Sequence, residues 1–257
     1  MKFWQFRAAK DDPKTGELLL YGIIESTSWW GDEVTPRQFK KDLDALGEID
    51  VLNVYINSPG GDVFASQAIY SMLKRQKCQV MVYVDGLAAS GASIVAMAGD
   101  KVYMPRNAMM MIHNPWTWGG GFAEDFRKMA DDLDKIRESL IAVYAEKSGQ
   151  DREKIIELLD AEFWMTAEEA LEYGFIDEIE EAKQVAACLK SGILVVNGQE
   201  MDLSRYKNPP KLGLLPQDLP PEPPPNPTAE DEQAQSLLSL LRAQIEVKKK
   251  KYLGGNA

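Results

Sequence analysis

The stretch VMVYVDGLAASGASIVAMAGDKVYMPRNAMMMIHNP, residues 80–115, joins apolar runs through turns of small residues. Its first run, residues 80–85, is rich in β-branched and aromatic side chains, as is typical of a buried strand. A turn at 86–89 leads to Ser90 and to a short helix at 94–98. Two more strands are predicted after this helix. Strands that alternate with helices predict a layered α/β domain.

Ser90 and His113 are the candidate catalytic pair. A serine at a strand-to-helix turn can present its hydroxyl at the sheet edge, beside backbone N–H groups that can hold developing negative charge. The hydroxyl is a weak nucleophile until a base removes its proton, and histidine is the usual base. His113 is the only histidine in the chain, so any Ser–His chemistry must use it. Taken singly, each residue is more often structural than catalytic.

A glycine-rich turn follows another predicted strand, in YINSPGGD at residues 55–62. Its two glycines allow backbone conformations that expose N–H groups to a ligand. Either Ser58 or Asp62 can cap the helix that follows. The Gly-Lys-Ser/Thr ending of a phosphate-binding loop is absent. An ordinary strand-to-helix turn is the alternative interpretation.

A third stretch, residues 160–177, contains two carboxylates before a short helix. Thr166 and Glu169 have the spacing of a capping box that begins this helix. Asp160 and Glu162 precede it, and either carboxylate could orient His113 and stabilise its protonated form. A carboxylate in this position is more commonly a solvated charge.

Together these stretches resemble the ClpP family of serine peptidases. The matching segments are residues 55–61, 86–90, 111–115 and 167–177, in the family's order and spacing, and the resemblance extends over roughly residues 15–182. It implies a crotonase-like spiral of ββα units. It also implies chemistry that uses neither a cofactor nor a metal ion.

The resemblance implies a role for each matching residue. Ser90 corresponds to the nucleophile and His113 to the general base, and the backbone N–H groups of Gly61 and Gly91 correspond to the oxyanion hole. Glu162 falls where the family usually has the aspartate of the triad, with Asp160 as the alternative acid. A second departure is Gly91-Ala92, where many bacterial members have Met-Gly.

Beyond the site, apolar residues between 122 and 144 recur at steps of four and three, which predicts a long amphipathic helix. In the family this helix is the handle through which two rings meet. We therefore expect a subunit contact here and a homo-oligomeric, heptameric ring. The aromatic loop at 115–121 either lines a substrate groove or packs on a neighbouring subunit.

The composition of the chain predicts four parts. A peptidase domain at 1–185 is followed by a small extension at 186–208, with a hairpin at 193–198. Repeated prolines at 209–227 predict a semi-rigid linker. Residues 228–257 have helical spacing and form either a docking helix or a disordered tail. The linker is also a candidate site of self-processing.

The net charge of −11 argues against nucleic acid as a partner. Two cysteines, Cys78 and Cys188, form neither a disulfide framework nor a clustered metal site, and fit a reducing cytoplasm. No run approaches the roughly 18 apolar residues of a membrane span.

The predicted function is a serine endopeptidase with polypeptide substrates. The Trp29-Trp30 region, the aspartate after the Pro-Gly-Gly motif and the tryptophan after His-Asn-Pro most resemble the bacteriophage head-maturation branch, which processes scaffold or capsid proteins. Three alternatives stay open. They are a catalytically dormant structural ring, a housekeeping Clp proteolytic subunit served by an ATPase, and a crotonase-fold acyl-CoA enzyme.

Overall fold

The computed structural model describes residues 2–26, 35–181, 187–190, 193–196, 199–203 and 206–209. These residues belong to the first of two units, Met1–Leu212; the second, Gly213–Ala257, lies outside the described residues. The same holds for Trp29-Trp30, for the predicted linker apart from Pro209, and for the predicted helical tail.

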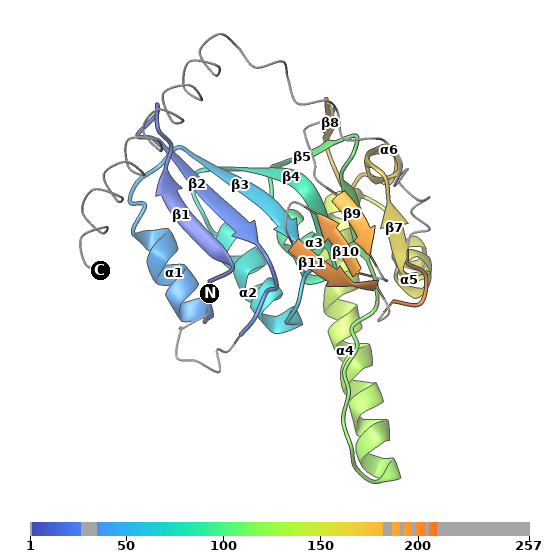
Figure 1. Ribbon diagram of the computed structural model, residues 1–257. Helices are drawn as coiled ribbons and strands as arrows, with labels where there is room; N and C mark the ends of the chain where they lie inside the picture. The colour runs from blue at the N-terminus through green and yellow to red at the C-terminus, as the bar shows by residue number, and fades with distance from the viewer. Residues whose placement is uncertain are drawn as a thin grey trace, which may run out of the picture. The chain divides into compact units, whose positions relative to one another are not determined.

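Within the described residues, eight strands form one sheet (Figure 1). Strands β2 to β5 and β8 run parallel, β1 joins the edge antiparallel to β2, and β6 pairs with both β4 and β7. The strands are β1 (Trp4–Ala8), β2 (Thr15–Tyr21), β3 (Val51–Ser58), β4 (Gln79–Ala89), β5 (Lys101–Pro105), β6 (Met109–Ile112), β7 (Phe163–Met165) and β8 (Glu178–Glu180). The structure therefore confirms the predicted α/β class.

Strand β4 has two successive partners along one edge. Its first half pairs with β5, and its last three residues pair with Met109–Met111 of β6. The predicted turn at 86–89 is therefore wrong. The strand continues to Ala89 because its apolar end finds backbone partners and burial against β6. As a result, the residues that follow β4 and β6, Ser90 and His113, leave the sheet side by side.

Six helices are described: α1 (Pro36–Asp44), α2 (Val63–Lys74), α3 (Gly91–Ala96), α4 (Ala123–Ser148), α5 (Arg152–Asp160) and α6 (Ala167–Glu172). Asp62, one of the two expected caps, begins α2 by accepting a 2.7 Å hydrogen bond from the N–H of Ala65. Helix α3 begins earlier than predicted because the carbonyl of Ser90 already accepts hydrogen bonds from the N–H groups of Ser93 and Ile94.

The predicted long helix is α4, which ends at Gly149 in the left-handed conformation. Its second half is packed on the domain through Leu140, Ile141 and Tyr144. Its first half extends away from the sheet (Figure 1), and Phe126 is exposed there together with Phe122 before it. Within one chain, only half of the apolar face is therefore buried. None of the described helices combines the length and the apolar composition needed to cross a bilayer.

A separate antiparallel sheet follows the main domain. Its strands are β9 (Ala187–Lys190), β10 (Ile193–Val196) and β11 (Gln199–Asp202), in the order β11-β10-β9. Leu194 and Leu203 are buried in one cluster with Leu87, Ala89 and Met111. The extension is therefore anchored on the ends of β4 and β6, next to Ser90 and His113.

Candidate active site

Ser90 connects β4 to α3 in a conformation that is rare for a residue with a side chain. Its φ is 52° and its ψ is −124°. Its N–H donates to the carbonyl of Met111 at 2.9 Å, and its carbonyl accepts the hydroxyl of Ser93 at 2.6 Å. Such a backbone costs about 1–3 kcal/mol and persists only where its surroundings enforce it. Here the β4–β6 pairing and α3 enforce it, and they present the hydroxyl at the sheet end.

His113 contacts this hydroxyl directly. Its Nε2 lies 2.8 Å from Ser90 Oγ, a hydrogen-bond distance. Burial lowers the pKa of His113 below its ordinary value, and the negative charge of Glu162 partly opposes that shift. The imidazole is therefore held in the neutral form that a general base requires.

Two glycines, Gly61 and Gly91, lie close together beside Ser90. Gly61 has a φ of 150°, and a Cβ there would lie 2.0 Å from the carbonyl oxygen of Ile24. A Cβ on Gly91 would lie 2.3 Å from Ser66 Oγ and 3.4 Å from the nitrogen of Gly61. Among the described residues, neither glycine donates its N–H to an acceptor. The two N–H groups are thus neighbours and are available to a negatively charged oxygen.

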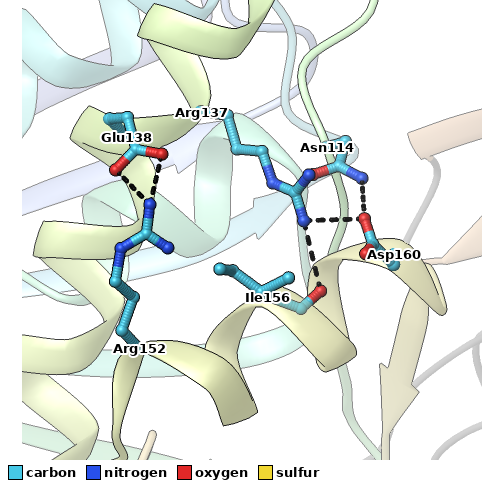
Figure 2. Close-up of polar contacts among 6 residues, drawn as sticks. All are labelled: Asn114, Arg137, Glu138, Arg152, Ile156 and Asp160. Atoms are coloured by element: carbon cyan, nitrogen blue, oxygen red, sulfur yellow. Dashed lines mark hydrogen bonds and ion pairs between the residues drawn. The ribbon is translucent and has the colours of Figure 1, made fainter.

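The two candidate acids have different surroundings. Asp160 accepts hydrogen bonds from Asn114 Nδ2 at 2.8 Å and from Arg137 Nη2 at 2.7 Å (Figure 2). These contacts lower the pKa of Asp160, the Asn114 bond most. Arg137 lies on α4 and Asn114 directly follows His113. Asp160 therefore ties the loop after His113 to α4 and α5.

Glu162 is the other residue with a side chain and a positive φ, 49°, among the described residues. It is only 7% exposed. Its carboxylate accepts the backbone N–H groups of Lys207 at 3.1 Å and Asn208 at 2.9 Å. The described contacts contain no hydrogen bond between Glu162 and His113, so its carboxylate acts on the imidazole through its charge.

Ser90, His113 and the two glycines line a cleft of about 420 Å³. Apolar side chains also line it. Two of them, Ile23 and Phe64, are 54% and 63% exposed. Asp202 and Tyr206 line it as well, which sequence reasoning missed. They belong to the extension, and no motif in the sequence relates them to Ser90. The described residues contain no group of three His, Cys, Asp or Glu side chains that could hold a metal ion.

Comparison with known proteins identifies the family. The Clp protease family model matches residues 37–183. The chain belongs to the Clp protease family. Two ATP-dependent Clp protease proteolytic subunits of Streptococcus pneumoniae, from strains Hungary19A-6 and CGSP14, are each 41% identical to it over 141 residues, covering 53% of this chain and 72% of each relative. The fold also matches that of a ClpP1 mutant from Listeria monocytogenes, with a TM-score of 0.57 and 29% identity, over 66% of this chain and 93% of that one.

The pH dependence of Ser90 reactivity in this member of the Clp protease family can be predicted from the surroundings of His113. A general base must be neutral, so reactivity falls as the pH drops through the pKa of His113. Since burial lowers this pKa, we expect the acidic midpoint below 6.5, the ordinary value for histidine. The measurement is the rate at which a fluorophosphonate labels Ser90 between about pH 5 and pH 9. Spontaneous probe hydrolysis over the same range is the control, and a midpoint above 6.5 would contradict the prediction.

Proposed function

We propose that this chain is a serine endopeptidase that uses Ser90, His113 and Glu162 as its triad and the N–H groups of Gly61 and Gly91 as its oxyanion hole. The observation that carries the proposal is the 2.8 Å contact between His113 Nε2 and Ser90 Oγ. The contact is made by a serine in a strained backbone conformation, at the floor of an open cleft. Strain of this kind is concentrated at functional sites.

The proposed reaction follows from this geometry. His113 Nε2 takes the proton of Ser90 as Oγ attacks the carbonyl carbon of a peptide bond. The carbonyl oxygen becomes negatively charged and accepts hydrogen bonds from Gly61 and Gly91. The protonated imidazole then gives its proton to the leaving amine, and the acyl group stays on Oγ. His113 next deprotonates a water molecule, which attacks the acyl carbon; the bond from this carbon to Oγ breaks, the imidazolium returns its proton to Oγ, and the carboxylic acid product leaves.

Glu162 supports this cycle through its charge. A buried carboxylate near His113 favours the protonated imidazole that forms in both transition states. Asp160 is the less suitable acid because the charge that acts on the His113 imidazole is that of Glu162, whereas the Asp160 carboxylate is engaged by Asn114 and Arg137. The glutamate is therefore the preferred third member of the triad.

The cleft and the exposed half of α4 support a polypeptide substrate and a ring. Exposed apolar side chains beside Ser90, such as Phe64, suit the side chains of an extended peptide. The exposed aromatic residues Trp118, Phe122 and Phe126 suit a contact with another copy of the chain. Rings of this family's type would enclose the clefts.

Within this activity we propose processing of phage scaffold or capsid proteins during head assembly. Its support is the sequence pattern around Trp116 and Asp62 and the long extension beyond the family match. The second candidate is a proteolytic subunit that receives unfolded chains from an ATPase. Its support is the relatives, which are named as subunits of an ATP-dependent protease.

The test of the activity is the intact mass of the full chain after treatment with a fluorophosphonate. We expect one adduct, located on Ser90 by peptide mapping, and none in His113→Ala. A folded wild-type protein that gains no mass would instead support a catalytically dormant ring.

The two biological roles differ in what the purified ring cleaves. Defined cleavage of a scaffold or capsid protein without ATP or an ATPase supports head maturation. Degradation that requires an added Clp ATPase supports the second candidate.

A further inference from the structure

Residues 206–208, here called the C-terminal segment, lie outside the family match at 37–183 and yet contact the proposed triad. The segment follows Leu203, which is 5% exposed and buried against the ends of β4 and β6. The backbone N–H of Tyr206 donates to the carbonyl of Leu203 at 3.1 Å. The segment is thus fixed to the domain immediately before it reaches the site.

The first contact is with the carboxylate of Glu162. Lys207 N–H donates to Oε2 and Asn208 N–H donates to Oε1, so each carboxylate oxygen has its own backbone donor. The side chain of Asn208 also donates to the carbonyl of Ala161 at 2.9 Å. Three hydrogen bonds therefore join the segment to the turn that carries Glu162. Hydrogen bonds to an ionised group are among the stronger ones in proteins.

The second contact covers His113. The ring of Tyr206 lies 5.8 Å from the imidazole, centre to centre, and 5.5 Å from the indole of Trp164 on β7. Tyr206 also lines the cleft with Ser90. The imidazole therefore has the Ser90 hydroxyl near Nε2 and an aromatic ring from the segment beside it.

These contacts account for the glutamate at this position. An aspartate side chain is one carbon–carbon bond shorter, about 1.5 Å. From the same backbone, its carboxylate would fall short of the N–H groups that Glu162 reaches. The additional methylene thus lets the carboxylate of Glu162 reach the C-terminal segment. Residues outside the family match at 37–183 thereby hold the acid near His113.

We propose that residues 206–208 are a positioning element of this active site, which holds Glu162 in place and covers His113. The proposal rests on the function proposed above, since it assigns His113 the role of base. It makes the extension part of the enzyme rather than an appendage.

The charge around His113 gives this proposal a measurable consequence. Glu162, before β7, is the charged group that acts on the imidazole; Asp62 and Asp202 line the same cleft, and Asp160 accepts a hydrogen bond from Asn114, the residue after His113. Two N–H donors hold the Glu162 carboxylate, whose charge raises the pKa of His113, while burial lowers it. Releasing Glu162 should therefore lower the pKa of His113, whereas removing the Tyr206 ring from beside the imidazole should raise it.

The test uses the full chain with 13C-labelled histidine and no histidine tag. His113 is the only histidine, so its NMR signal needs no assignment and reports its pKa directly. Asn208→Pro removes the backbone donor that holds Glu162, and we expect it to lower the pKa of His113. Asn208→Ala keeps this donor and should lower the pKa less. Tyr206→Ala uncovers the imidazole and should raise the pKa. Unchanged midpoints in folded Asn208→Pro and Tyr206→Ala proteins would overturn the proposal, whether or not the protein cleaves peptides.

A double-mutant cycle connects the segment to catalysis. Glu162→Asp and Asn208→Pro are each expected to slow the labelling of Ser90 by a fluorophosphonate about ten-fold. The double variant should be slowed by about the same factor, because both changes break the same contact between Glu162 and the segment. A double variant slowed by the product of the two single effects would contradict the proposal. So would a Glu162→Asp protein that is labelled as fast as wild type. Wild-type protein that is never labelled would refute the proposed function instead, and the histidine titration would still decide the role of the segment.

Discussion

Replacing Ser90 with alanine is expected to reduce peptide hydrolysis about 10⁴- to 10⁶-fold, the largest effect of any substitution considered. The reason is that Oγ is the proposed nucleophile, with His113 Nε2 2.8 Å away. The alanine fits the space of the serine, although the positive φ at this position remains strained. The measurement is kcat/KM on a fluorogenic peptide, with circular dichroism and ring size to confirm folding.

His113→Ala is the matched variant for this prediction. Residues that act as a unit do not have additive effects, so the double variant should be no slower than Ser90→Ala alone. A Ser90→Ala protein that retains a tenth of the wild-type rate would show that another residue is the nucleophile. Independent, multiplying effects would show that His113 does not act through Ser90.

Gly61→Ala is expected to have the second largest effect, a loss of at least about a hundred- to a thousand-fold in kcat. The new Cβ would lie 2.0 Å from the carbonyl oxygen of Ile24, which is backbone and cannot rotate away. The residue also has a φ of 150°, where alanine is strained. The turn must therefore move, and the N–H proposed to bind the oxyanion moves with it.

Gly47→Ala is a suitable control. Gly47 also has a positive φ, 71°, but a Cβ added there would meet none of the described residues within 4 Å, and Gly47 does not line the cleft. It should lose about 1 kcal/mol of unfolding free energy and retain wild-type kcat. Urea unfolding and steady-state kinetics of both variants separate backbone strain from loss of the donor. A Gly61→Ala enzyme with wild-type kcat would remove Gly61 from the proposed oxyanion hole.

Much of the architecture was predictable because its signals are local. The run of β-branched residues at 80–85 predicts a strand, Thr35-Pro36 begins α1, and Thr166 with Glu169 caps α6. Ser90, His113 and the two glycines were identifiable because each lies within a short motif at the end of a strand. The resemblance to the Clp protease family also rests on these motifs.

The errors arose where distant segments compete for the same backbone or side chain. Residues 86–89 contain a glycine and small side chains, which suggests a turn, but β6 offers them hydrogen bonds and burial. The long amphipathic helix was predicted correctly as α4; its first half extends away from the sheet and exposes Phe126, and the subunit contact expected there stays a prediction.

The sequence by itself determined the α/β class and the family, and it made Ser90, His113 and the two glycines candidates for the site, because strand patterns and short motifs depend on neighbouring residues. Only the tertiary structure distinguished Asp160 from Glu162, which are two residues apart. Arg137 and Asn114 engage the first, while the second is held by residues 207 and 208 and acts on His113. The physical reason is that the electrostatic environment of a carboxylate is set by groups from distant parts of the chain, which only the packed structure brings together.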